Sequence, residues 1–263
     1  MRSTCLPLAT AFFVASVAAP TVGFADASGD SANLPDIVGV HLGMSLEQAR
    51  TAFQKAYGSF SHIDQLDMRF GPGGAMKAAY LLRTSNTDAG HANGTMEVDV
   101  TLPPNAQQVW HMTRQVKQPN VNRANFLAAL RQKYGKESVA ISDATRGPTK
   151  DDNAIYQMYW VFDEQGRPAS GEPPFINQTP FGCPLGTSQP KIPQGLPEYC
   201  AEHYVGIFVE MNNGPIIQFT QFDLIDYPLL VRNTSATIAF SQAQDRRIEQ
   251  DNQQKAQQAR PAL

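Results

Sequence analysis

A segment near residue 45 carries the signals for both ends of an amphipathic helix, and it constrains the fold more than any other stretch. Ser45 can cap the N-terminus, and Gln48, three residues later, completes a capping box. Gly58 supplies the left-handed residue at which helices commonly end. The apolar side chains between them recur at the spacing of one helix face: Leu46, Ala49, Phe53, Ala56 and Tyr57. We therefore predict a helix over residues 45–58, with Phe53 and Tyr57 buried against a sheet.

A second segment repeats this pattern further along the chain. Asn122 is the predicted cap and Gly135 the predicted stop. Its apolar face has four members: Phe126, Leu127, Leu130 and Tyr134. Segments 53–58 and 130–135 also end alike, in Tyr-Gly shortly after a lysine. The chain is thus predicted to contain two similar helices.

Strand-like segments follow each predicted helix. Residues 96–102 alternate apolar and polar side chains, which predicts a strand with one buried face and one wet face. The other expected strands are residues 66–70, 76–83 and 109–116 after the first helix, and residues 155–162, 204–211 and 216–220 after the second. This order predicts an α+β fold of two tandem modules, residues 36–118 and 119–226. Each module has one helix plus about four antiparallel strands.

The N-terminus has the pattern of a secretory signal. Arg2 forms a positive start, and the apolar stretch at residues 6–19 is too short for a comfortable membrane span. The small-x-small rule fits cleavage after Ala25 or after Ala27, and the first is preferred, so residues 1–25 are the predicted signal peptide. An uncleaved anchor is the alternative. The predicted location is the bacterial periplasm or the outside of the cell.

Cleavage after residue 25 leaves an acidic chain. It removes one basic residue, Arg2, and no acidic one, so 20 basic and 24 acidic side chains remain and the net charge is −4. This balance argues against nucleic acid and anionic lipid as main partners. No later apolar run has the length of a membrane span, so no integral span is expected. The expected partner is another envelope protein or envelope component.

Two cysteines, Cys183 and Cys200, remain after the signal peptide is removed. In an oxidising compartment they are predicted to form one disulfide. A zinc site built from both cysteines and His203 is the competing interpretation.

The disulfide falls inside an insertion, residues 164–202, that the first module lacks. Eight prolines in it remove the donors that a strand ladder needs, which predicts an extended surface loop. Three aromatic residues of this loop and one on a strand are the candidate interaction residues: Phe175, Phe181, Tyr199 and Trp110. For Trp110, packing in the core is the favoured interpretation over a partner-facing position.

Residues 227–263 are predicted to form a C-terminal helix and a polar tail. Asp226 is the expected cap, and the helix is expected to be interrupted or weakened near residues 233–235. From residue 241 the chain is rich in glutamine and charge, which is typical of either a solvated helix or a disordered tail.

No residue pattern predicts catalysis. The common motifs of serine hydrolases, zinc proteases and dithiol enzymes are missing from the sequence. The five histidines stand in five separate segments, which favours isolated roles over a metal cluster. Asp223 and Asp226 could act as paired carboxylates, but an outward strand position for Asp223 and capping by Asp226 explain them more simply. We expect no catalytic residues, no metal and no cofactor.

The segment Leu42-Gly43-Met44-Ser45-Leu46-Glu47-Gln48-Ala49 resembles the helix start of small exported envelope proteins of the BamE type. Their helix-plus-sheet fold is similar to one half of the β-lactamase-inhibitor protein, and the tandem arrangement resembles that inhibitor's two-module build. The resemblance implies an envelope location and supports the fold class. The leading functional hypothesis is a non-enzymatic exported binding or interaction protein that uses its sheet faces and the proline-rich loop. The alternatives are a hydrolase or small-ligand-binding protein with a pocket between the modules, and a secreted enzyme inhibitor.

Overall fold

The computed structural model describes residues 36–58, 61–70, 74–84, 94–163, 166–169, 175–176, 179–180, 183, 200, 205–212 and 214–258. The chain divides into two units, Met1–Asp30 and Ser31–Leu263. The predicted signal peptide lies outside the described residues, and every described element belongs to the second unit.

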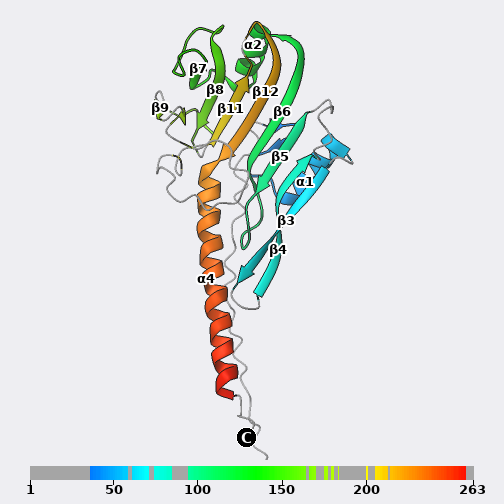
Figure 1. Ribbon diagram of the computed structural model, residues 1–263, viewed down its shortest axis with the longest axis vertical. Helices are drawn as coiled ribbons and strands as arrows, with labels where there is room; N and C mark the ends of the chain where they lie inside the picture. The colour runs from blue at the N-terminus through cyan, green and yellow to red at the C-terminus, as the bar shows by residue number, and fades with distance from the viewer. Residues whose placement is uncertain are drawn as a thin grey trace, which may run out of the picture. The chain divides into compact units, whose positions relative to one another are not determined.

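The second unit is built around an eight-stranded antiparallel sheet (Figure 1). From one edge to the other its strands are β3 (Ser61–Phe70), β4 (Gly74–Thr84), β5 (Thr95–Val100), β6 (Val109–Asn122), β12 (Ile216–Asp226), β11 (Val205–Met211), β8 (Ile155–Phe162) and β7 (Val139–Ser142). Two small strand pairs lie outside it, β1 (Asp36–Ile37) with β2 (Val40–His41) and β9 (Phe175–Ile176) with β10 (Thr179–Pro180). The helices are α1 (Leu46–Tyr57), α2 (Arg123–Tyr134) and α4 (Tyr227–Gln258). The predicted α+β class with a C-terminal helix is confirmed.

The caps predicted for the first two helices are present. The Ser45 side chain accepts from the Gln48 N–H while the Gln48 side chain accepts from the Ser45 N–H, so the capping box is complete. Asn122 caps α2 by accepting from two backbone N–H groups. Gly58 and Gly135 follow the last helical residues with positive φ.

The strand order places two four-strand meanders side by side. α1 precedes β3–β6, and α2 precedes β7, β8, β11 and β12; the last strands of the two sets, β6 and β12, pair in the middle of the sheet. Strand β7 was not predicted, and β6 and β12 run several residues beyond the predicted segments. That the two halves are copies of one module stays a prediction.

One row of paired residues from six neighbouring strands forms the centre of the core. It consists of Leu82, Val98, Met112, Leu224, Ile207 and Trp160. Each of these side chains is at most 1% exposed. Phe53 and Tyr57 of α1 and Leu127 of α2 belong to the same cluster, so both helices cover this face of the sheet. The predicted burial of Phe53 and Tyr57 is confirmed.

Helix α4 starts directly after β12, where Asp226 accepts a hydrogen bond from the Leu229 N–H as the predicted cap. The expected interruption near residues 233–235 is wrong, because the helix is continuous from Tyr227 to Gln258. Asn233 instead serves a tertiary contact, since its side-chain oxygen accepts from the Leu102 N–H at 3.0 Å. Residues 241–258 of the expected tail are therefore helical, and residues 259–263 lie outside the described part. Among the helices that the structure describes, none has the length and apolar character to cross a membrane.

The start of β5 depends on a glycine. Gly94 has φ of +73°, and a Cβ atom there would lie 2.0 Å from the backbone oxygen of Gln115. We expect Gly94→Ala to lower the free energy of unfolding by roughly 2–4 kcal/mol, from left-handed strain and the steric clash together. Gly147→Ala is the matched control, because its nearest neighbouring atom would lie 3.8 Å away. Urea denaturation of both variants tests this, and equal stabilities would contradict it.

Candidate functional site

A β-bulge turns Trp110 toward α4. Asp99 pairs with His111, but the next pair is Val100 with Val109, so Trp110 is an extra residue on β6. Its ring lies against the His111 ring, with centroids 5.3 Å apart, and packs in a cluster with Tyr227 and Leu230 of α4. Trp110 is only 4% exposed, which agrees with the predicted core position.

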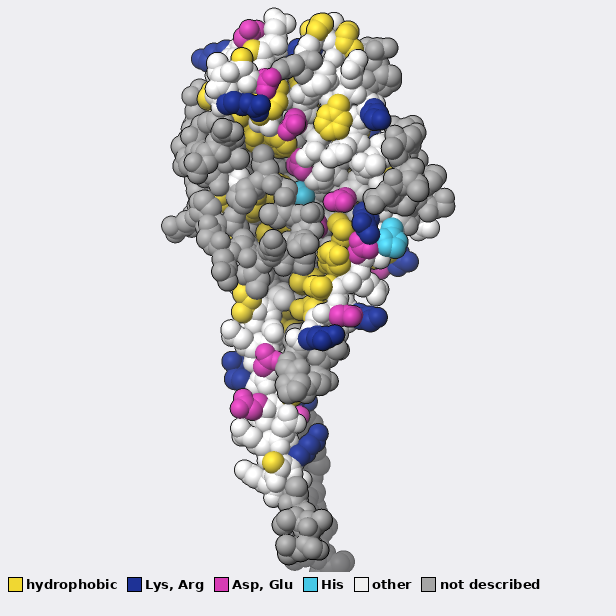
Figure 2. Space-filling model, viewed as in Figure 1, with side chains coloured by type: hydrophobic (Ala, Val, Ile, Leu, Met, Phe, Trp, Pro, Cys, Tyr) yellow, Lys and Arg dark blue, Asp and Glu magenta, His cyan; other side chains and the backbone are white. Residues whose placement is uncertain are grey.

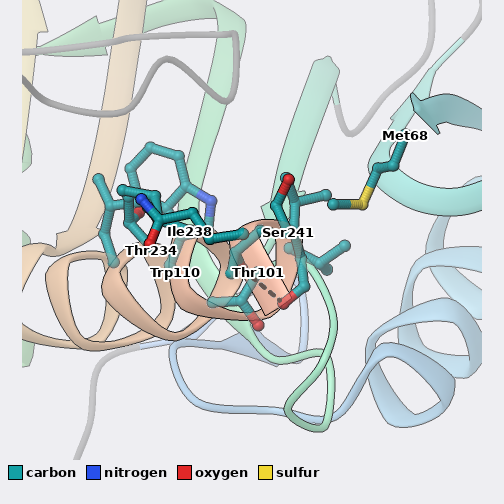
Figure 3. A pocket seen from close by; sticks show the side chains of 11 residues that line it. Met68, Thr101, Trp110, Thr234, Ile238 and Ser241 are labelled. Atoms are coloured by element: carbon teal, nitrogen blue, oxygen red, sulfur yellow. Dashed lines mark hydrogen bonds between the residues drawn. The ribbon is translucent and has the colours of Figure 1, made fainter. Parts of the chain in front are cut away.

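Beside Trp110 lies a cavity of about 340 Å³ between α4 and the sheet (Figure 3). Its apolar lining comes from β3, the end of β5, β6 and α4: Met68, Val100, Leu102, Trp110, Leu230 and Ile238. We call this cavity the α4 pocket. Figure 2 shows hydrophobic side chains gathered beside α4 toward the β3–β4 hairpin. The volume falls in the range of about 300–1,000 Å³ that is typical of small-molecule sites.

Hydrogen bonds fix both walls of the α4 pocket. Besides the Leu102–Asn233 bond, the Thr237 hydroxyl donates to the Pro103 carbonyl at 2.7 Å, which ties α4 to the loop after β5. The Thr101 hydroxyl accepts from the Gln108 N–H at 2.9 Å and closes that loop on itself. These bonds join protein groups to one another, so the positions of the pocket walls do not depend on contacts with a ligand.

The polar lining of the pocket is uncharged: Thr101, Thr234, Thr237, Ser241 and Gln242. Thr234, Ile238 and Ser241 stand at spacings of four and three residues, so they share one face of α4. The hydroxyls of Thr101 and Thr237 are used in the bonds above. Among the residues that the structure describes, the Thr234 and Ser241 side chains make no hydrogen bond.

A buried charge network lies behind Trp110 on the same face of the sheet. His111 Nδ1 is 2.7 Å from Asp99 Oδ2, and His111 Nε2 is 3.6 Å from Asp223 Oδ1. Thr113 donates to Asp223 Oδ1, and Gln221 donates to Asp223 Oδ2 at 2.9 Å. The side chains of Asp99, His111 and Asp223 are only 2–3% exposed.

The network favours the protonated imidazole. Burial by itself would lower the pKa of His111, but interactions with Asp223 and Asp99 outweigh it and raise the pKa to about 9. The cluster therefore holds a cation between two carboxylates at neutral pH. Within the described residues, no three His, Cys, Asp or Glu side chains are placed to hold a metal ion.

The expected solvent-facing positions of two of these residues are wrong. Asp99 belongs to the expected wet face of its strand and Asp223 was expected to point outward, yet both are buried. Strand pairing across β5, β6 and β12 places His111, a strand histidine, between these two carboxylates. No signal in the sequence links Asp99 to Asp223, because their proximity arises only from the β6–β12 pairing.

The predicted disulfide is present between Cys183 and Cys200, with both residues fully buried beside Trp110, Val161 and Ile225. Their sulfurs are therefore not thiolate ligands, and the zinc interpretation is wrong. Of the candidate interaction residues, Phe181, Tyr199 and the side chain of Phe175 lie outside the described part. The pocket residues of α4 were missed, because an uncharged stripe on a polar helix carries no sequence motif.

The disulfide should contribute strongly to stability. Replacing both Cys183 and Cys200 by alanine is expected to lower the free energy of unfolding by about 3 kcal/mol, since the loop closed in the unfolded chain is lost. Urea denaturation with and without a reducing agent measures this. The reductant should lower the urea midpoint of the parent chain and leave that of the double variant unchanged. If the reductant does not change the urea midpoint of the parent chain, the prediction is contradicted.

The charge network should make stability depend on pH. The folded pKa of His111 is raised from 6.5 to about 9, so its stabilisation is fully present below about pH 6.5 and is lost as pH rises through about 9. We expect the free energy of unfolding to fall by roughly 1–3 kcal/mol over that interval. His111→Gln should remove this slope, whereas the control His62→Gln, at an exposed site, should keep it. Equal slopes in the two variants would count against the network.

Comparison with known proteins finds no matching family model, no similar curated protein and no similar solved structure. The resemblance to BamE-type envelope proteins and to the β-lactamase-inhibitor protein therefore stays a prediction. The chemistry of the α4 pocket and of the network beside it is the basis for a functional proposal.

Proposed function

We propose that this chain is a non-enzymatic exported binding protein and that its ligand occupies the α4 pocket. The observation that carries the proposal is a preformed cavity of about 340 Å³ with apolar walls and a few uncharged polar groups. Small-molecule sites commonly combine an apolar lining with a few placed polar groups in this way.

Export is supported by two features. The first is the signal pattern of residues 1–25, and the second is the buried disulfide, because such bonds persist in oxidising compartments. The periplasm or the outside of the cell is the corresponding proposed location.

A binding role is preferred over hydrolysis because of where the titratable groups lie. Asp99, His111 and Asp223 are nearly inaccessible, and none of them lines the α4 pocket. A general acid or base must reach its substrate within hydrogen-bond distance. Two additional proposals stay open. One is recognition of an envelope protein by the proline-rich loop, and the other is inhibition of an enzyme.

Binding of the fluorescent dye N-phenyl-1-naphthylamine tests the proposal. Ile238→Glu places a charge in the pocket lining, whereas Ala239→Glu places the same side chain at an exposed position of the same helix. We expect saturable dye binding by the parent chain and by Ala239→Glu, and a loss of roughly tenfold or more in affinity for Ile238→Glu. Circular dichroism checks that both variants fold.

Two results would contradict the proposal. One is that the folded parent chain shows no saturable dye binding. The other is that Ile238→Glu binds the dye as tightly as Ala239→Glu does, which would place the dye elsewhere.

A further inference from the structure

We infer that the α4 pocket selects a neutral amphiphile, a single alkyl chain with an uncharged hydroxyl or amide headgroup, over charged amphiphiles of the same length. This inference rests on the proposed function and assigns the class of ligand.

The length of the pocket indicates a chain-like ligand. Its lining on α4 runs from Leu230 to Gln242, which is about 18 Å along the axis at 1.5 Å per residue. A volume of about 340 Å³ spread over that length is a narrow channel, whose shape suits an alkyl chain lying along it.

The polarity of the channel changes along its length. Trp110 and Leu230 are nearly fully buried and pack in one cluster at the end where α4 leaves the sheet. Ser241 and the exposed Gln242 lie further along the helix. Figure 3 shows Trp110 and Thr234 together, with Ser241 and Met68 toward the other side. An alkyl chain would therefore enter with its tail toward Trp110 and its headgroup near Ser241.

The lining offers hydrogen bonds but no charge. The Thr234 and Ser241 hydroxyls make no hydrogen bond within the described part of the chain, so they can donate to or accept from a ligand. A charged headgroup would lose hydration without gaining a counter-charge from the lining. By contrast, the lining of a second cavity of about 200 Å³ beside α2 includes the charged residues Asp36, Arg114 and Lys133.

Competition against bound N-phenyl-1-naphthylamine at neutral pH tests the ligand class. The competitors are decan-1-ol, decanoate and decyltrimethylammonium, which share a chain and differ in headgroup charge. We expect decan-1-ol to displace the dye at concentrations roughly tenfold or more below those of both ions. If either ion competes as well as the alcohol does, the inference is overturned while the binding function stands.

Substitutions on α4 test whether the Ser241 hydroxyl contacts the ligand headgroup. Ser241→Ala should weaken the binding of decan-1-ol by roughly fivefold and leave the dye affinity close to that of the parent chain. Ser235→Ala, on the exposed side of α4, is the control and should change neither affinity. Parent-like affinity of Ser241→Ala for decan-1-ol would overturn the placement of the headgroup near Ser241. If the folded parent chain does not bind the dye at all, both the proposed function and this inference are overturned.

Discussion

The register of the central strands is the constraint on which the rest of the structure depends. Six strands align so that one row of paired residues, from Leu82 to Trp160, points to the helix-covered face. The adjacent row, which includes Asp99, His111 and Ile225, must then point to the opposite face. A shift of any central strand by one residue would exchange these faces, placing carboxylates under the helices and core side chains under α4.

The face opposite the two helices α1 and α2 therefore carries both charged and apolar side chains, and the charged ones are stable only because they pair with one another. A charge left unpaired at this depth would cost several kcal/mol, so Asp99, His111 and Asp223 are stable only as a group. The disulfide, Val161 and Tyr227 supply apolar packing beside them. Trp110 joins the two regions, since its ring contacts His111 on one side and the α4 pocket on the other.

Three local features together create the α4 pocket. The bulge at Trp110 breaks the alternation of β6, Asp226 directs α4 away from the end of β12, and Asn233 holds the helix against the loop after β5. Between these anchors the helix surface carries small hydroxyls and Ile238, which do not fill the space beside the sheet. A cavity remains because hydrogen bonds hold the two walls at a spacing that the side chains between them do not fill.

The sequence by itself determined the local structure. The capping residues Ser45, Asn122 and Asp226 and the stops at Gly58 and Gly135 act through neighbouring backbone groups, so their roles could be predicted from spacing alone. With Cys5 assigned to the predicted signal peptide, the two other cysteines likewise allowed only one disulfide.

Only the tertiary structure decided where the chemistry lies. Asp99, His111 and Asp223 are spread over more than a hundred residues, and their contact depends on the β6–β12 pairing, which no local pattern encodes. The α4 pocket depends in the same way on the docking of a polar helix through Asn233, a residue whose local propensity had indicated a weak point in that helix.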